Sequence, residues 1–261
     1  YPKIDLTKKE TFENIIREEK PDVILHFAAY TDVSQAENQR DDKNGACWQI
    51  NVEGTRNLVK LAKEVNAHFI HISTDYVFPG SEEDPGPHKE SDIPEVNSSK
   101  LTWYGFTKAE AERVVNSILG RKRTILRLVY PVRAKYPAKL DYLRKPLSLF
   151  DQGKLYSLFN DQQVTITFIN EACLALEKII NDKLYGFFHA STPDTSTPFE
   201  LVSYLIEKAK GKKNVVKEAS LDNSSVRYQK FGGLKVEETQ KALGIKFSPW
   251  HQVIDQIVAN F

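Results

Sequence analysis

The chain has 261 residues, with 36 Lys and Arg against 35 Asp and Glu, and 41% of its residues are hydrophobic. These values are typical of a soluble globular protein with one large or two modest domains. A net charge of +1 lacks the basic excess of a nucleic-acid or anionic-membrane binder. Two cysteines, Cys47 and Cys173, exclude a disulfide scaffold and a cysteine-based zinc cluster, and no apolar run approaches the ~18 residues that span a bilayer. We therefore expect a soluble, cytoplasmic protein without nucleic-acid, membrane or metal partners.

The first elements predicted along the chain are a helix and a strand. Thr7-Lys8-Lys9-Glu10 has the form of a capping box, and Phe12, Ile15 and Ile16 have the spacing of a buried helical stripe. Pro21 ends this helix, because the residue before a proline disfavours the helical conformation. The continuous apolar run at 22–27 is typical of a strand buried on both faces.

The next elements continue this alternation. A long helix is expected over 42–65, a second buried strand over 68–73, and a loop rich in Pro, Gly and acidic residues over 79–94. A helix over 103–119 ends at Gly120, and a strand over 124–128 follows. Repeated strand, helix and strand predict an α/β fold, a doubly wound parallel sheet with helices on both faces. Ligands of such sheets bind beyond the carboxyl ends of the strands, which here means 28–32, 73–76 and the segment after Leu128.

The second half of the chain is less regular. Prolines punctuate the segment after Tyr130, and a helix is expected over 141–151. A helix over 170–181 and a strand over 186–190 are predicted to return to the main sheet. Helices near 198–210, 236–243 and 249–259 complete a smaller second lobe.

Tyr104 and Lys108 are the first residues that indicate a reaction. They lie four apart in a predicted helix and therefore share one face of it. An ammonium group beside a phenol lowers the pKa of the phenol, which can then give or take a proton at a carbonyl or an alcohol. The pair is weak evidence alone, but Ser73–Tyr76 places hydroxyl groups at a strand end, and the small side chains at 28–29 would admit a cofactor.

These segments together resemble a known family, the extended short-chain dehydrogenase/reductases, and within it the dTDP-4-dehydrorhamnose reductase group. The likeness is carried by Pro-Asp-Val-Ile-Leu-His-Phe-Ala-Ala-Tyr-Thr-Asp-Val at 21–33, Asn-Val-Glu-Gly-Thr at 51–55, Ile-Ser-Thr-Asp-Tyr-Val-Phe at 72–78 and Tyr-Gly-Phe-Thr-Lys-Ala-Glu at 104–110. Residues 161–168 resemble the Asp-Gln…Pro-Thr segment of the family, with Ile166 where proline is usual.

The resemblance implies a Rossmann-type fold and a hydride exchange between NADP or NAD and C4 of a nucleotide sugar. Tyr104 would protonate the developing alkoxide, Lys108 would lower the pKa of Tyr104 and hold the nicotinamide ribose, and Thr74 would bind the carbonyl oxygen. The residues implied in cofactor binding are Asp5, Leu6, Ala28, Ala29, Tyr30, Thr31, Asn51, Ser73, Tyr104 and Lys108, with Asp5 and Leu6 at the adenine and Asn51 as a buttress. The residues implied in substrate binding are Thr74, Asp75, Tyr76, Arg133 and Lys135.

The resemblance also assigns a role to each part of the chain. Residues 1–130 would form the dinucleotide-binding domain, to which 168–190 returns, and 131–167 with 191–261 would form the substrate lobe. Members of the family begin with a Gly-x-x-Gly-x-x-Gly turn that binds the pyrophosphate. This sequence contains no such turn, so we expect the first βαβ unit of the fold to be absent from it and to lie before Tyr1.

Three functions remain open on the sequence. Nucleotide-sugar dehydratases of the superfamily carry an acidic pair after the threonine, whereas Asp75-Tyr76 lacks the second acid, which favours simple reduction of a 4-keto nucleotide sugar. The alternatives are another nucleotide-sugar epimerase or reductase and a regulatory subunit that binds a dinucleotide without turnover. A homodimer is left open as well.

Overall fold

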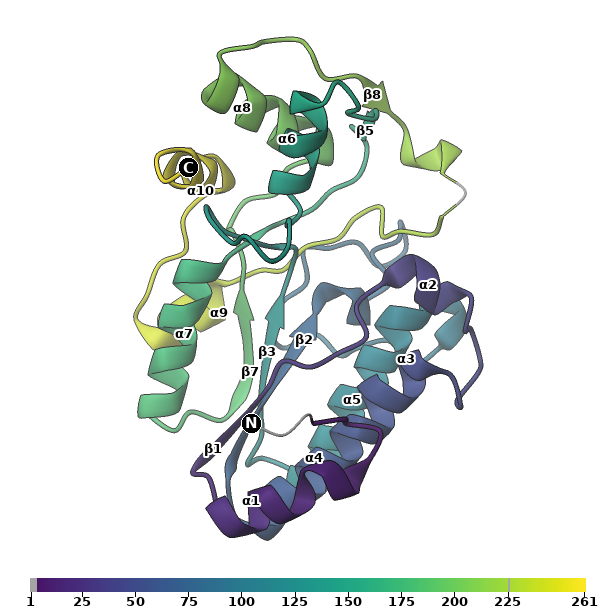
Figure 1. Cartoon of the computed structure of the whole chain (residues 1–261), viewed down its shortest axis with the longest axis vertical. Helices are drawn as coiled ribbons and strands as arrows, with labels where there is room; N and C mark the ends of the chain where they lie inside the picture. The colour runs from purple at the N-terminus through teal and green to yellow at the C-terminus, as the bar shows by residue number, and fades with distance from the viewer. Residues whose placement is uncertain (1–3, 225) are drawn as a thin grey trace. The chain divides into compact units, whose positions relative to one another are not determined.

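The computed structural model describes residues 4–224 and 226–261 (Figure 1). The chain divides into two compact units, which interleave along the sequence. Unit 1 comprises Tyr1–Pro79, Ile93–Arg127 and Lys178–Phe188, and unit 2 comprises Gly80–Asp92, Leu128–Glu177 and His189–Phe261. Of the residues expected in the first domain, the stretches 80–92, 128–130, 168–177 and 189–190 fall in unit 2.

The main sheet has four strands in the order β1-β2-β3-β7 (Figure 1). Their bounds are Val23–His26 for β1, His68–Thr74 for β2, Thr124–Leu128 for β3 and Gly186–Ala190 for β7. Strands β1 and β2 pair in parallel, with Val23 opposite His68 and His26 opposite His71. The expected class, a parallel α/β sheet with helices, is confirmed.

Strand β1 differs from its prediction in burial. Val23, Ile24 and Leu25 are only half-buried, and His26 alone in the strand is buried. The expectation of a strand covered on both faces is therefore wrong for three of its four residues. The physical reason is position, because β1 pairs only with β2 among the described strands and lies at the edge of the sheet.

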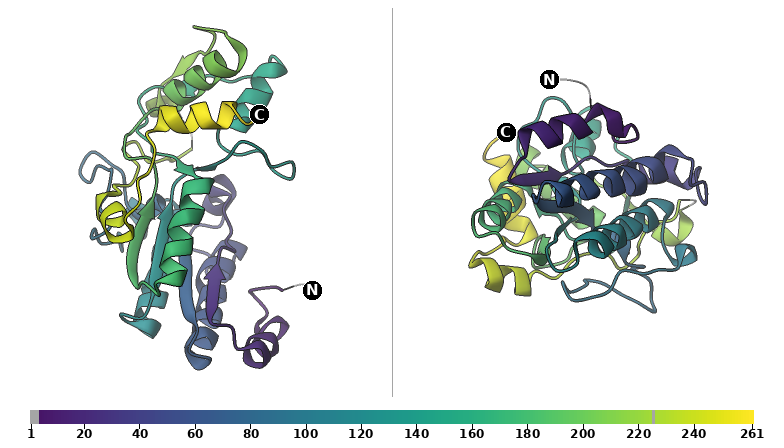
Figure 2. Two further views of the ribbon diagram at one scale, coloured as in Figure 1. Left: turned by 90° about the vertical axis from the view of Figure 1, so that its left-hand side faces the viewer. Right: turned by 90° about the horizontal axis from the view of Figure 1, so that it is seen from below.

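The helices of unit 1 form a layer on its sheet. The bounds are Glu13–Glu19 for α1, Val33–Glu37 for α2, Ala46–Trp48 for α3, Thr55–Glu64 for α4 and Trp103–Leu119 for α5, with short 3-10 turns at Lys9–Thr11 (η1), Asp75–Val77 (η3) and Ser98–Lys100 (η4). Figure 2 shows α1, α4 and α5 side by side in the view from below, and α4 and α5 both pack against β2. Buried side chains of the helices and of the sheet make one core, which includes Phe12 before α1, Val59 of α4, Phe69 of β2 and Ile125 of β3.

Two helical predictions in this unit need correction. The capping box at 7–10 does not form, because α1 begins at Glu13 and the Thr7 hydroxyl donates to Asp5 Oδ1 instead (2.7 Å). The helix expected over 42–65 begins only at Ala46, and it is not an α-helix throughout, since a π-helical segment, η2 (Gln49–Gly54), lies between α3 and α4. Such segments are common near functional sites, and this one places Asn51 in the interior.

Unit 2 is built on helices that pack around small sheets. Its elements are β4 (Pro131–Val132), α6 (Arg144–Asp151), β5 (Leu158–Phe159), β6 (Thr167–Phe168), α8 (Pro198–Lys210), β8 (Glu218–Ala219), η5 (Leu221–Asn223), α9 (Glu237–Leu243) and α10 (Trp250–Val258), and α7 (Ile169–Asn181) runs from this unit into unit 1. Helix α8 packs against α6 and α10 (Figure 1) and begins with a capping box formed by Thr197 and Glu200. Ile166, which stands where the family has proline, is fully buried in the core of this unit.

No helix within the described residues combines the length and the apolar character that crossing a membrane would need.

Candidate functional site

The candidate site of unit 1 begins where β2 ends, at Thr74. The Thr74 hydroxyl caps η3, because its Oγ1 accepts from the Tyr76 backbone N–H at 3.3 Å, and it donates to Asp75 Oδ1 at 3.1 Å. The Thr74 hydroxyl also interacts with the Tyr104 phenol, whose pKa it lowers. The Tyr104 ring also meets the Tyr76 ring edge to face, with centroids 5.8 Å apart. The hydroxyls of Thr74 and Tyr104 are therefore adjacent, on side chains whose rotation is restricted.

Gly105 allows this close approach of α5 to η3. A Cβ atom at this position would lie 2.1 Å from the Tyr76 carbonyl oxygen, far inside contact distance. The Gly105 N–H also donates to Thr102 Oγ1 at 3.0 Å, the side-chain cap of α5. The glycine after Tyr104 thus has a packing reason, and it fixes the depth at which the phenol reaches the end of β2.

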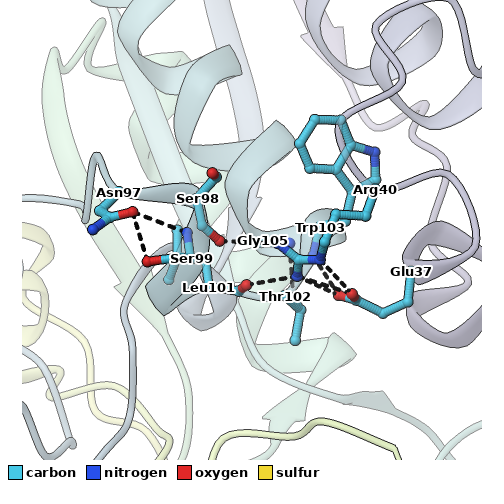
Figure 3. Close-up of polar contacts among 9 residues, drawn as sticks. All are labelled: Glu37, Arg40, Asn97, Ser98, Ser99, Leu101, Thr102, Trp103 and Gly105. Carbon is cyan, nitrogen blue, oxygen red and sulfur yellow. Dashed lines mark hydrogen bonds and ion pairs between the residues drawn. The ribbon is translucent and has the colours of Figure 1, made fainter.

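An ion pair on α2 and the turn after it holds the segment that leads into α5 (Figure 3). The Arg40 guanidinium contacts Glu37 at 2.9 Å and donates to the carbonyls of Ser98 (3.0 Å) and Leu101 (2.9 Å). The Glu37 carboxylate also accepts the backbone N–H of Trp103, the first residue of α5. A carboxylate at this end of a helix is favourable, because it faces the positive end of the helix dipole. Glu37 and Arg40 thereby fix the start of the helix that carries Tyr104.

Asn51 connects the end of β1 to α5 through both ends of its amide. Its Oδ1 accepts the Tyr30 N–H (2.7 Å), and its Nδ2 donates to the Tyr30 carbonyl (3.2 Å) and to Thr107 Oγ1 (2.9 Å). Thr107 in turn donates to the Tyr104 carbonyl at 2.8 Å. Asn51 and Thr107 are buried, so these bonds persist without competition from water.

Lys108 lies one turn beyond Tyr104 on α5, and its amine reaches β2. Lys108 Nζ lies 3.1 Å from His71 Nε2 and donates to the Ile72 carbonyl at 2.7 Å. Its side chain is 3% exposed, and this burial lowers the pKa of Lys108 to about 8, while Glu112 and Cys47 oppose the fall. Its amine therefore titrates near neutral pH.

The expected effect of Lys108 on the Tyr104 phenol is wrong for this structure. Desolvation raises the pKa of Tyr104 well above its ordinary value, Asp75 and Cys47 raise it further, and only the Thr74 hydroxyl lowers it. The physical reason is that the amine is directed to His71 and Ile72, so it makes no hydrogen bond with the phenol within the described contacts. The phenol is consequently held protonated, which suits a group that donates a proton.

Five further residues expected at the cofactor follow or belong to the carboxyl ends of two strands, with 28–31 after β1 and Ser73 in β2. Ala28 and Thr31 are exposed, and Ala29 and Tyr30 are half-buried, so the chain after β1 presents backbone and small side chains. Ser73 is 4% exposed, and its Oγ has no hydrogen-bond partner within the described structure. A buried, unpaired hydroxyl next in sequence to Ile72, whose carbonyl accepts from the Lys108 amine, could pair with a hydroxyl of a nicotinamide ribose.

Asp5 and Leu6 lie before η1, away from the end of β2 in sequence. The Asp5 carboxylate accepts from Thr7, through its N–H at 3.0 Å and its hydroxyl at 2.7 Å. Leu6 packs on Gly54 of η2, where an added Cβ would come within 2.8 Å of the Leu6 side chain. Their assignment to the adenine stays a prediction.

The residues expected at the substrate fall in both units. Asp75 and Tyr76 are buried in η3 beside Thr74. Arg133 and Lys135 belong to unit 2, where the Arg133 guanidinium lies 4.0 Å from the centre of the Tyr136 ring. The structure brings together Thr74, Asp75, Tyr76, Tyr104 and Lys108, and the roles of Arg133 and Lys135 stay predictions.

Sequence reasoning missed two histidines that belong to this site. His71 contacts Lys108, and the His26 ring lies 5.3 Å from the His71 ring. Their register in the parallel pair, with His26 opposite His71, was the signal that could have placed them together. They do not form a metal centre: across 4–224 and 226–261 no group of His, Cys, Asp and Glu has that arrangement.

Comparisons with known proteins agree with the fold. A dTDP-4-dehydrorhamnose reductase of Aggregatibacter actinomycetemcomitans is 29% identical over 99% of this chain and 88% of its own length. A methionine adenosyltransferase 2 subunit beta of Rattus norvegicus is 28% identical over 98% of this chain and 78% of its own length. The crystal structure of a dTDP-4-dehydrorhamnose reductase from Bacillus anthracis in complex with NADP superposes with a TM-score of 0.85, at 26% identity over 99% of this chain and 87% of that chain. The family model described as the RmlD substrate binding domain matches residues 1–261, and the chain belongs to that family.

Proposed function

We propose that this protein reduces the C4 ketone of a nucleotide sugar to an alcohol, with NADP or NAD in its reduced form as the hydride donor. The observation that carries the proposal is the cluster at the carboxyl end of β2, where the Thr74 and Tyr104 hydroxyls meet and the Lys108 amine lies one helical turn away. The similarity to dTDP-4-dehydrorhamnose reductases over nearly the whole chain supports this reaction and the dinucleotide.

The reaction adds one hydride and one proton across the carbonyl group. Lys108 and Ser73 would hold the ribose of a reduced nicotinamide, which would supply the hydride for the carbonyl carbon and leave oxidised. Tyr104 donates its phenolic proton to the carbonyl oxygen, where the negative charge develops. The Thr74 hydroxyl, which donates to Asp75 Oδ1 in the structure, would turn to donate its proton to the same oxygen. The raised pKa of Tyr104 keeps the phenol protonated at neutral pH, which is the state that can donate a proton.

Other side chains of the site would bind the cofactor or support the reacting groups, and they take no part in proton transfer. The Lys108 amine and the Ser73 hydroxyl are the groups that would hold the nicotinamide ribose, because both are buried at the end of β2. Asn51 buttresses the site through Tyr30 and Thr107. Thr107 holds the Tyr104 backbone through its carbonyl, and the Tyr76 ring packs against the Tyr104 ring, which gives the phenol the positioning that proton transfer requires.

Reduction is favoured over elimination by the residues after Thr74. An elimination of water needs a second acid or base at the strand end, and the chain carries Asp75 and then Tyr76. The Tyr76 ring packs against Tyr104 and is buried, so it is part of the support for the phenol. The proposal includes a cytoplasmic location, function alone or as a homodimer, and no nucleic-acid partner.

The test is the loss of NADPH absorbance with dTDP-4-dehydrorhamnose as the substrate. We expect turnover by the protein and a fall of about 10²–10⁴-fold in kcat for Tyr104→Phe, because this change removes only the proton donor. The affinity for NADPH, measured by fluorescence titration, should stay within about twofold of the original, since one CH group replaces C–OH at a position that reacts with substrate.

Each outcome separates the three functions. NADPH binding without turnover on any 4-keto nucleotide sugar would favour the regulatory-subunit alternative, to which the similarity with methionine adenosyltransferase 2 subunit beta gives weight. Turnover with a different activated sugar would favour another reductase or epimerase. Full activity in Tyr104→Phe would refute the assigned proton donor.

A further inference from the structure

Two buried histidines lie next to the amine of Lys108. His71 is fully buried and His26 is 3% exposed, and they face each other across the β1–β2 pair. His71 Nε2 lies 3.1 Å from Lys108 Nζ, and His26 Nε2 lies 2.9 Å from Thr55 Oγ1. No step of the proposed reaction uses either imidazole.

The contact with Lys108 determines the state of the His71 ring. An ammonium group can only donate hydrogen bonds, so His71 Nε2 must be the acceptor and the ring proton must lie on Nδ1. His71 Nδ1 is buried without a hydrogen-bond partner among the residues that the structure describes. An unpaired buried N–H lowers the stability of the fold, so the Nδ1–H of His71 is unfavourable. The other ring nitrogen, Nε2, accepts the hydrogen bond from Lys108.

The surroundings keep His71 in this acceptor state. The titratable groups that face Lys108 are His26 on β1, His71 on β2, Cys47 on α3 and Glu112 on α5. Burial, with the nearby Lys108 charge, holds the pKa of His71 well below its ordinary range. The imidazole therefore stays neutral, and its lone pair remains available to the amine wherever the amine is charged.

We infer that His71 is a positioning residue, which holds the ammonium of Lys108 at the carboxyl end of β2 and sets the alkaline limit of the pH range in which Lys108 is charged. The inference rests on the proposed function only for its consequence in turnover. The geometry itself, an amine shared between the His71 imidazole and the Ile72 carbonyl, is a property of the fold.

Three variants isolate the hydrogen bond from the packing. His71→Leu removes the acceptor at similar volume, and His71→Gln supplies a carbonyl oxygen close to the place of Nε2. His68→Leu is the matched control, because His68 lies on the same strand, is 6% exposed and also has an unpaired Nδ1, but pairs with Thr124 instead of Lys108.

The primary measurement is the pKa of Lys108 from the NMR titration of its Cε signal, assigned by comparison with Lys108→Arg. Losing a hydrogen bond to a charged group lowers a lysine pKa, and the expected shift in His71→Leu is about one to two pH units. His71→Gln should restore most of the wild-type value, and His68→Leu should leave it unchanged. With the substrate, the alkaline limb of kcat should move to lower pH by the same amount in His71→Leu.

The wild-type protein gives an independent test, which does not depend on whether a variant folds. The ¹⁵N shifts of the His71 ring should report a neutral imidazole with its proton on Nδ1. A proton on Nε2 would overturn the inference, as would equal pKa shifts of Lys108 in His71→Leu and His71→Gln, or none in either. If the NMR results hold and no variant turns over a 4-keto nucleotide sugar, the inference stands and the proposed function fails.

Discussion

Gly105→Ala tests how closely α5 must approach the end of β2. Helix propensity alone predicts that alanine at an interior helical position stabilises the protein by about 1 kcal/mol. The structure predicts the opposite, because the new Cβ would lie 2.1 Å from the Tyr76 carbonyl oxygen, whereas Cβ atoms essentially never come within 3.0 Å of another heavy atom. Helix α5 or η3 must therefore move by roughly 0.9 Å, the difference between these two distances.

Such a shift has a cost in stability and a larger one in turnover. Forcing a methyl group into a packed contact costs about 1–3 kcal/mol, which outweighs or cancels the gain in propensity. Tyr104 precedes the substituted residue and its phenol interacts with Thr74, so a displacement of this size is expected to reduce kcat by about 10²-fold.

The assay compares urea unfolding and NADPH-dependent turnover of Gly105→Ala with those of Gly153→Ala. Gly153 has open space within 4 Å of an added Cβ but a φ of +67°, so that variant reports backbone strain without a clash. We expect Gly153→Ala to lower the free energy of unfolding by about 1 kcal/mol and to leave turnover unchanged. A Gly105→Ala protein that is as stable and as active as the original would refute the reasoning about this contact.

The other predictions concern buried charge and the support of α5. Burial, with a smaller contribution from Lys108, lowers the pKa of His26 to about 3, so the unfolded chain takes up a proton first as the pH falls below 6.5. The stability that depends on neutral His26 is fully present above pH 6.5 and is lost as the pH falls towards 3. At pH 5 this loss is about 2 kcal/mol of unfolding free energy. In His26→Leu, the fall in unfolding free energy between pH 7 and pH 5 should therefore be smaller by about 2 kcal/mol. Glu112→Leu removes the carboxylate that pairs with the fully buried Arg127 at 2.8 Å, and it should lower the free energy of urea unfolding by about 3–5 kcal/mol. The double variant Glu112→Leu with Arg127→Met should recover most of this loss, because no charge is then left buried without its partner. Equal losses in the single and double variants would contradict this reasoning. Glu37→Ala removes the carboxylate that binds Arg40 and the first N–H of α5, and should lower stability by about 1–2 kcal/mol together with kcat; unchanged turnover would show that this contact does not position the site.

Several elements were predictable because their signals are local. Helix α5 and strand β3 have the limits that the sequence predicted, since Thr102 caps the helix, Gly120 ends it and the strand is a short apolar run. The capping box at 7–10 failed because a short motif does not determine a helix start when the following residues take another turn. The π-helical segment η2 could not be predicted, because the sequence over 42–65 has a helical pattern. A π-helical segment within a helix does not change that pattern.

The sequence by itself determined the chemical groups of the site and the chain segments that carry them. A strand that ends in Ser73 and Thr74, and a helix with Tyr104 and Lys108 one turn apart, follow from hydrophobic pattern and spacing. Only the tertiary structure decided what these groups do to one another. Helix α5 packs across β2, and this contact, which joins residues as far apart in sequence as His71 and Lys108, turns the Lys108 amine towards His71 and desolvates the half-buried phenol of Tyr104. Desolvation and hydrogen-bond direction depend on neighbours that are distant in sequence, so the sense of each pKa shift could not be obtained from the spacing of two residues on one helix.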